Sequence, residues 1–216
     1  MPVSDPRAAT GTEVPACRAQ VGKPGGADRK HDPADQNDEE RTMHAVDESE
    51  IQRFWEVARG HAGIDRLGVV VGASALGAVP PQAWSFGDSP RLADELLAHV
   101  LDGEKRACST AVWELEHAGE PMPAVGELSI LLDGAGHPRG LIRTTVVRIA
   151  AFEDVDAAFA AAEGEDDRTL ESWRREHEKY WRRVAETTGG PEFTPDMPLV
   201  LEEFELLYQQ PPASEQ

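Results

Sequence analysis

The chain has 216 residues, of which 40% are hydrophobic, and a formal net charge of -19 at pH 7. This acidity argues against a protein that coats nucleic acid or an anionic membrane by bulk attraction. No segment is long and apolar enough to cross a bilayer, the start lacks the apolar stretch of a signal peptide, and two cysteines make no disulfide framework. The sequence therefore predicts a cytoplasmic globular protein in which any nucleic-acid contact is local.

Residues 1–45 are rich in Pro, Gly, Ala, Asp and Arg and contain almost no large apolar side chains. Such a segment cannot bury enough surface to offset the entropy lost on ordering, so we predict a disordered tail. Met43 directly precedes the first periodic segment. Two interpretations stay open: translation starts at Met43, or the tail is a genuine part of the protein.

A helix and a connector are predicted over residues 46–83. Asp47 and Glu50 have the spacing of a helix-capping box, and apolar side chains recur at helical spacing from Ile51 to Ala58. The connector that follows is rich in Gly, Ala and Pro, with one short apolar strand at residues 69–71. A second helix is predicted over residues 89–103, because Ser89 and Pro90 suit its start and Gly103 suits its end.

The pattern of the remaining residues predicts both strands and helices. Residues 127–149 predict a β-hairpin, and in its second strand Ile142, Thr144 and Val146 share one face while Arg143 and Thr145 share the other. Further helices are predicted over 154–164 and 169–187, and a last strand over 198–208. This order predicts an α+β fold, a small curved sheet or partial β-barrel with helices packed outside.

Four stretches of this region carry a family resemblance: FGDSPRLADELLAHVLDGEKRACS, VGELSILLDGAGHPRGLIRTTVVRI, AEGEDDRTLESWRREHEKYW and DMPLVLEEFELLY. In this order they resemble successive blocks of the ASCH domain, a relative of the PUA domain. The resemblance covers roughly residues 84–208 and leaves 209–216 as a flexible C-terminus. It implies a PUA-like β-barrel with flanking helices and a cleft across its mouth.

The resemblance also implies two kinds of activity. Members of the family are associated with RNA binding and, in some cases, with ribonuclease activity, whereas others are small amidohydrolases that remove the acyl group from N4-acetylcytidine. The amidohydrolases carry a Gly-x-Lys-x-x-Thr segment after the first domain helix and a glutamate in an acidic loop. These positions correspond to Lys105 and Glu165. The threonine is replaced here by Cys108, a different nucleophile, and Ser109 follows it directly.

Each of these residues also has a structural interpretation. Lys105 could simply favour the dipole at a helix end, act as a base when desolvated, or hold an anion as a fixed charge. Cys108 could be a small core residue or an activated nucleophile. Asp166 and Asp167 suit the start of the next helix, and Thr169 suits its N-cap. The aromatic stripe of that helix, including Trp173, His177 and Trp181, is typical of a core. No cofactor is predicted, and a divalent metal on the acidic run has weak support.

The basic residues are few: from residue 84 onward the chain has 12 Lys and Arg against 27 Asp and Glu. Lys105 together with Arg106, Arg143 and Thr145 could still form a positive cleft inside an acidic shell, which suits a small nucleotide or a short single strand. Alternatively, Arg143 pairs with a neighbouring carboxylate. Three functions follow as hypotheses: recognition of RNA or a modified nucleotide, with ribonuclease activity; hydrolysis of N4-acylated cytidine or a similar amide; or a non-catalytic interaction module.

Overall fold

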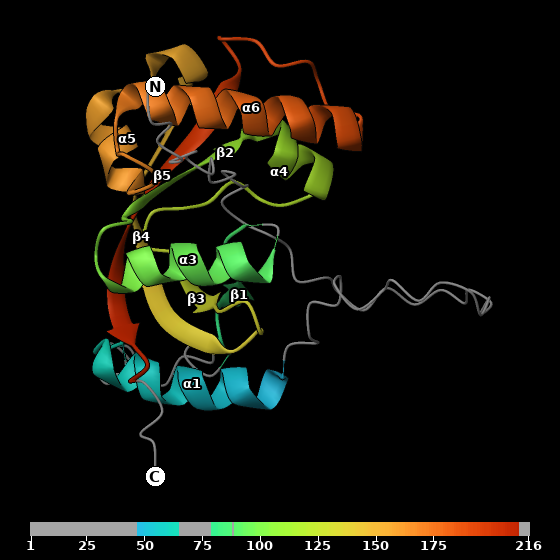
Figure 1. Cartoon of the computed structure of the whole chain (residues 1–216). Helices are drawn as coiled ribbons and strands as arrows, with labels where there is room; N and C mark the ends of the chain where they lie inside the picture. The colour runs from blue at the N-terminus through green and yellow to red at the C-terminus, as the bar shows by residue number, and fades with distance from the viewer. Residues whose placement is uncertain (1–46, 65–78, 88, 212–216) are drawn as a thin grey trace, which may run out of the picture.

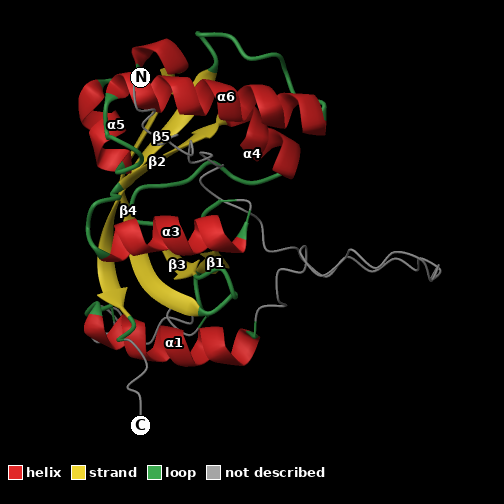
Figure 2. Cartoon of the chain, viewed as in Figure 1, coloured by secondary structure: helices red, strands yellow, loops and turns green. Residues whose placement is uncertain are grey.

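The computed structural model describes residues 47–64, 79–87 and 89–211. The predicted tail, the predicted strand at 69–71 and the last five residues lie outside these ranges. Within the described residues the fold is α+β, as predicted: a five-stranded sheet curls into a half-barrel, and helices pack around it (Figure 2). None of the described helices is both long and apolar enough to span a membrane.

The sheet has the strand order β1-β3-β4-β5-β2. Its centre is a long antiparallel pair, β4 with β5, and the predicted hairpin joins β3 to β4. The edge strand β2 pairs antiparallel with β5, and the short edge strand β1 pairs parallel with β3. The strands are β1 (Gln82–Trp84), β2 (Ala107–Ala111), β3 (Leu128–Leu132), β4 (Pro138–Ala151) and β5 (Pro198–Gln209).

A β-bulge in β4 changes which side chains face the core. The register with β5 skips one residue between Thr144 and Val146, so Thr145 has no partner in the ladder. Thr144 is buried, whereas Thr145 and Val146 are both exposed. The prediction that Val146 shares the buried face of Ile142 and Thr144 is therefore wrong, because an extra residue in one strand reverses the alternation beyond it.

The helices cover the two ends and the middle of the long strands. Figure 1 shows α6 lying across one end of β4 and β5, together with α4 and α5, while α1 lies across the other end and α3 lies between them. The predicted capping residues Asp47 and Thr169 each accept a backbone hydrogen bond at a helix start. The helices are α1 (Glu48–His61), α3 (Pro90–Leu101), α4 (Val112–Ala118), α5 (Ala157–Glu163) and α6 (Leu170–Thr188), with a 3-10 turn at Phe152–Asp154.

The aromatic stripe of α6 belongs to the core. Trp173 and Trp181 pack against Phe152, with ring centroids 5.3 and 5.9 Å apart respectively, and Tyr180 belongs to the same buried cluster. Glu114 of α4 accepts hydrogen bonds from the Tyr180 hydroxyl and from Trp181 Nε1, both at 2.8 Å. These contacts fix α6 over the sheet and so fix the polar side chains that it presents inward.

Two loops meet beside α6 and are fastened to one another. The backbone N–H of Arg106, in the α3–β2 loop, donates to the carbonyl of Ala162 at 2.7 Å, and Arg168 pairs with Glu104 at 2.6 Å. Gly164, in the α5–α6 loop, has a φ of 73°, and a Cβ there would lie 2.6 Å from the Glu104 carbonyl oxygen. The close approach of the two loops therefore requires glycine at position 164.

Substitution of Gly164 tests this contact against a matched control. Gly189 also follows a helix with a φ of 73°, but nothing lies within 4 Å of its added Cβ. We expect Gly189→Ala to lower the free energy of unfolding by about 1 kcal/mol through backbone strain alone. Gly164→Ala should cost a further ~1–3 kcal/mol because the loops must separate. Urea denaturation of both variants measures the difference, and equal losses would contradict the loop contact.

Candidate functional site

The Lys105 ammonium lies inside the protein where these two loops meet. Its side chain is fully buried, and its Nζ lies 2.6 Å from Glu165 Oε1 and 3.6 Å from Glu163 Oε2. The ammonium also donates to the backbone carbonyl of Glu163 at 3.3 Å, and it lies 5.5 Å from the centre of the Phe86 ring. Lys105 is therefore an inward-facing cation held by two carboxylates, not a surface charge at a helix end.

Glu163, the last residue of α5, is the centre of this cluster. Its Oε1 accepts hydrogen bonds from Ser109 Oγ at 2.7 Å and from Trp173 Nε1 at 2.9 Å. Its Oε2 lies 3.6 Å from the Lys105 ammonium and 3.5 Å from His177 Nε2. Oε1 therefore accepts two hydrogen bonds, Oε2 lies between an ammonium and an imidazole nitrogen, and the side chain is only 1% exposed. A carboxylate with this many partners is fixed in place and has no free position for another proton donor.

Glu165 has a different environment. Its side chain is 12% exposed and is held by the ion pair with Lys105. The residues after it include two non-glycine positions with left-handed backbone, Asp166 with a φ of 48° and Arg168 with a φ of 62°. Backbone conformations of this kind cost free energy and cluster at functional sites. Glu165 is thus the carboxylate of the cluster that reaches the surface, and it is carried on a strained loop.

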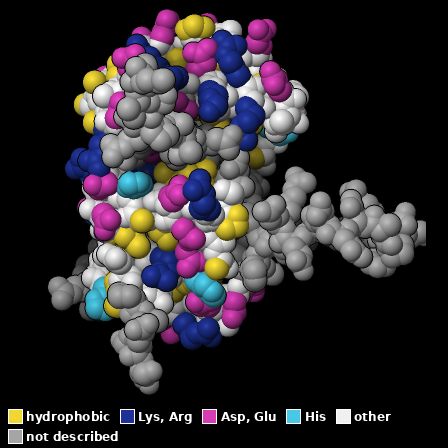
Figure 3. Space-filling view, viewed as in Figure 1, with side chains coloured by type: hydrophobic (Ala, Val, Ile, Leu, Met, Phe, Trp, Pro, Cys, Tyr) yellow, Lys and Arg dark blue, Asp and Glu magenta, His cyan; other side chains and the backbone are white. Residues whose placement is uncertain are grey.

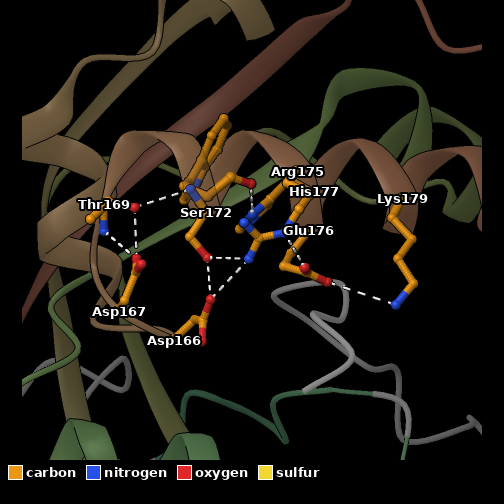
Figure 4. Close-up of polar contacts among 9 residues, drawn as sticks. Asp166, Asp167, Thr169, Ser172, Arg175, Glu176, His177 and Lys179 are labelled. Atoms are coloured by element: carbon orange, nitrogen blue, oxygen red, sulfur yellow. Dashed lines mark hydrogen bonds and ion pairs between the residues drawn. The ribbon is translucent and has the colours of Figure 1, made fainter. Parts of the chain in front are cut away.

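The next two acidic residues build the start of α6. Figure 4 shows Asp167 beside Thr169 and Asp166 beside Ser172 and Arg175. Asp167 accepts from the Thr169 backbone N–H at 2.9 Å, and Asp166 accepts from the Ser172 hydroxyl and pairs with Arg175 at 3.2 Å. These contacts agree with the structural interpretation of both aspartates, and they anchor the loop that carries Glu165.

The charges of the cluster set its protonation. Burial alone would lower the pKa of Lys105, but the carboxylates of Glu165 and Glu163 outweigh burial and raise that pKa above its ordinary value. Burial would raise the pKa of Glu163, but the His177 and Lys105 cations outweigh it and lower that pKa to about 2. At neutral pH the site therefore holds an ammonium and an ionised Glu163. Lys105 in this state is a fixed positive charge rather than a base.

A metal ion would compete with Lys105 for this cluster. Glu163, Glu165 and His177 each offer one ligand atom, and these atoms lie within 4.8 Å of one another. Such a set could hold a divalent cation. However, the Lys105 ammonium already contacts two of the three residues, and two adjacent positive charges repel each other. The donor set fits a metal only if Lys105 first withdraws from both carboxylates.

Sequence reasoning named Cys108 and Ser109 as candidate nucleophiles of which a strand could direct only one to a cleft, and the structure directs Ser109 to the cluster. Ser109 faces the cluster through its bond to Glu163, whereas Cys108 lies on the other face of β2 in an apolar cluster that includes Phe86 and Phe204. Successive residues of a strand alternate between faces, so only one of the two can line a given site. Cys108 is buried, with 2% of the residue exposed.

The predicted substrate-binding residues do not join Lys105. Arg106 and Thr145 are exposed, and the Thr145 hydroxyl donates to the Glu203 carbonyl at 3.1 Å. Arg143, also exposed, binds Glu205 across β4 and β5 through an Nε to Oε1 hydrogen bond of 2.8 Å. The expected cleft of several cations therefore differs from the structure, because Arg143 lies on the outward face of β4 and is paired there. The second basic side chain beside Glu163 is instead that of His177, which sequence reasoning assigned to the core.

The family follows from comparison with known proteins. The family model of the ASCH domain matches residues 82–208, more than half of the chain. The chain belongs to the ASCH domain family. A crystal structure of an ASCH domain from Lactobacillus crispatus is similar at 30% identity and a TM-score of 0.64, covering 78% of this chain and all of that one. A crystal structure of a protein from Enterococcus faecalis is similar at 29% identity and a TM-score of 0.59, covering 73% of this chain and 88% of that one. No curated protein matches this chain.

The acid stability of this ASCH domain tests the Glu163 contacts. The ordinary pKa of the group is 4.5 and its folded pKa is about 2, so ionised Glu163 stabilises the fold fully above pH 4.5. That contribution is lost as the pH falls from 4.5 to about 2, and it amounts to on the order of 3 kcal/mol. We expect Glu163→Gln to lack this loss and to be less stable at neutral pH.

Urea denaturation followed by tryptophan fluorescence over this pH range measures the effect. Glu178→Gln is the matched control, because Glu178 is half-exposed on α6 and pairs with Arg182 at the surface. Loss of the Glu178 charge should change the free energy of unfolding by about 0–1 kcal/mol and leave its pH dependence intact. The same pH dependence in wild type and Glu163→Gln would show that Glu163 does not carry the ion pairs assigned to it.

Proposed function

We propose that this ASCH domain recognises RNA or a modified nucleotide and that Lys105 and Glu165 hydrolyse an amide on its base, such as the one in N4-acylated cytidine. The observation that carries the proposal is the buried ammonium of Lys105 at 2.6 Å from Glu165 Oε1, the member of the cluster that reaches the surface. An ammonium and a carboxylate in contact supply the two groups that amide hydrolysis needs: a charge to stabilise an oxyanion and a base for water.

Charge favours a neutral amide over a phosphodiester at this site. Two carboxylates already surround Lys105, so a phosphodiester would bring a further negative charge into a buried cluster. An amide carbonyl is neutral on binding and becomes negative only in the transition state. His177 is not available as the acid or base of a ribonuclease, because it is 3% exposed and is already engaged with Glu163 and the Trp173 carbonyl.

The molecular surface gives the same preference for a small ligand. Lys and Arg side chains gather over α6 on the face that Figure 3 shows, interspersed with Asp and Glu. Arg175, Lys179 and Arg182 on this helix each pair with a carboxylate of the same region. These pairs leave little net attraction for a long phosphate backbone, so recognition of a nucleoside, nucleotide or short single strand is favoured.

In the proposed reaction, Glu165 takes a proton from a water molecule while the oxygen of that water molecule attacks the amide carbonyl carbon. The carbonyl oxygen becomes negative, and the Lys105 ammonium stabilises it. The bond between carbonyl carbon and amine nitrogen then breaks, and Glu165 returns its proton to the leaving amine. One water molecule is consumed, and the products are a carboxylic acid and the free amine of the base. We assign no step to Cys108, to Glu163 or to a metal ion.

The proposal is tested with N4-acetylcytidine and a panel of short single-stranded RNAs. Wild type should release acetate and cytidine and leave the RNAs intact, and Glu165→Gln should lower kcat by about 10²–10⁴-fold. Glu165→Gln is preferred to Lys105→Ala because it keeps a hydrogen-bond acceptor near Lys105 and does not leave two carboxylates buried without their cation. Glu178→Gln should match wild type.

The other two hypotheses predict different results. RNA cleavage by wild type that is lost in Glu165→Gln would replace the amidohydrolase by a ribonuclease at the same residues. If folded wild type hydrolyses none of the acylated nucleosides and none of the RNAs, hydrolysis is rejected and the non-catalytic interaction module is the hypothesis that stands.

A further inference from the structure

We infer that His177 is an imidazolium at neutral pH, the second buried cation of the site, and that it acts through Glu163 as a positioning residue for Lys105. The kinetic part of this inference rests on the proposed function. The protonation state of His177 stands on geometry and is tested without any substrate.

The hydrogen-bonding capacity of the His177 ring carries the argument. Nδ1 lies 3.0 Å from the backbone carbonyl oxygen of Trp173, which can only accept, so Nδ1 must carry a proton. Nε2 lies 3.5 Å from Glu163 Oε2, and the Lys105 ammonium 3.6 Å from the same oxygen favours an ionised carboxylate that also can only accept. A neutral imidazole has one N–H and would turn a lone pair toward one of these oxygens. A ring that satisfies both carries two protons and a positive charge.

The charge balance of the cluster gives the same answer. The ionisable groups around His177 are Glu163 from α5, Glu165 from the α5–α6 loop and Lys105 from the α3–β2 loop. With a neutral ring, two carboxylates and one ammonium leave a net negative charge in a largely buried cluster, which is costly. With an imidazolium, the formal charges of the four groups sum to zero. Burial opposes the charged ring, but Glu163 outweighs burial and raises the pKa of His177.

Aromatic neighbours further favour the charged ring. The His177 ring stacks on Trp173 with centroids 4.3 Å apart, and the Trp181 ring lies 5.4 Å away. A cation above an aromatic face is attracted by the electrons of the ring, most strongly when both are out of water. The stripe that forms the α6 core is thus also the environment that keeps His177 charged.

The consequence for Lys105 comes through Glu163. Glu163 Oε2 lies between the two cations, 3.6 Å from Lys105 Nζ and 3.5 Å from His177 Nε2. While His177 is charged, Glu163 neutralises both cations in part, and Lys105 keeps positive potential for an oxyanion. If His177 were neutral, both carboxylates would act on Lys105 alone, and its effect on a developing negative charge would weaken. Loss of the imidazolium should therefore lower kcat and leave KM nearly unchanged.

The first experiment is nitrogen NMR of the full chain labelled at histidine, with the signals assigned by comparison with His177→Gln. At about pH 7.5, one unit above the ordinary histidine pKa of about 6.5, the His177 ring should show two protonated nitrogens. In Glu163→Gln the same ring should be neutral, whereas Glu178→Gln should retain the wild-type signals. A neutral His177 ring in folded wild type at this pH would overturn the inference.

The second experiment measures N4-acetylcytidine hydrolysis by His177→Gln and His177→Lys, after circular dichroism has checked that each variant is folded. His177→Gln should lower kcat by about 10–100-fold with KM within about twofold, as for other residues that act through a neighbouring group. His177→Lys should recover part of the loss because it restores the charge. A wild-type kcat in folded His177→Gln would overturn the positioning role, and so would equal losses in both variants.

Failure of the proposed function and failure of the inferred charge state of His177 give different experimental results. A doubly protonated His177 in a protein that hydrolyses no amide would reject the proposed function and support the charge state. Amide hydrolysis by a protein whose His177 is neutral would support the proposed function and reject this inference.

Discussion

The rest of the structure depends on one interaction, the ammonium of Lys105 held away from water by the carboxylates of Glu163 and Glu165. A buried charge is tolerated only when its partners are in place, and removal of one partner costs about 3–5 kcal/mol. The α3–β2 loop supplies the cation, the end of α5 and the next loop supply the anions, and β2 and α6 supply hydrogen bonds to Glu163. Docking of these elements and formation of the site are therefore one event.

Two carboxylates that are two residues apart in the sequence differ because their surroundings differ. Glu163 ends α5, faces donors on both oxygens and is buried; Glu165 follows a glycine with left-handed backbone and reaches the surface. The turn at Gly164 directs both side chains to the same ammonium from two sides. The structure thereby distinguishes a carboxylate enclosed in the protein from one that reaches the surface, which neither residue type nor spacing alone would specify.

The sequence predicted most elements of the fold and three members of the candidate site, Lys105, Ser109 and Glu165. Capping residues and apolar periodicity located the long helices and the hairpin, and the family resemblance pointed to Lys105 and Glu165. Short elements were missed: β1 has three residues and depends on pairing with β3, and α4 has seven. The bulge at Thr145 and the partners of Glu163 were also missed, because both depend on distant segments. A glutamate in an acidic run and a histidine in an aromatic stripe gave no sequence signal that they would meet.

The proposed function has to account for action on a nucleotide by an ASCH domain with a net charge of -19, and charge neutrality within the buried cluster supplies the explanation. On the proposed function, an attractive field for phosphate is unnecessary, because the buried cluster interacts with a group that is neutral until the reaction begins. With His177 charged as inferred, the two cations and two anions cancel before the reaction, so the developing oxyanion would meet a nearby ammonium without an opposing excess of charge. Specificity then has to come from contacts to the base and the acyl group, and added salt should affect binding far less than it affects proteins that hold phosphate backbones.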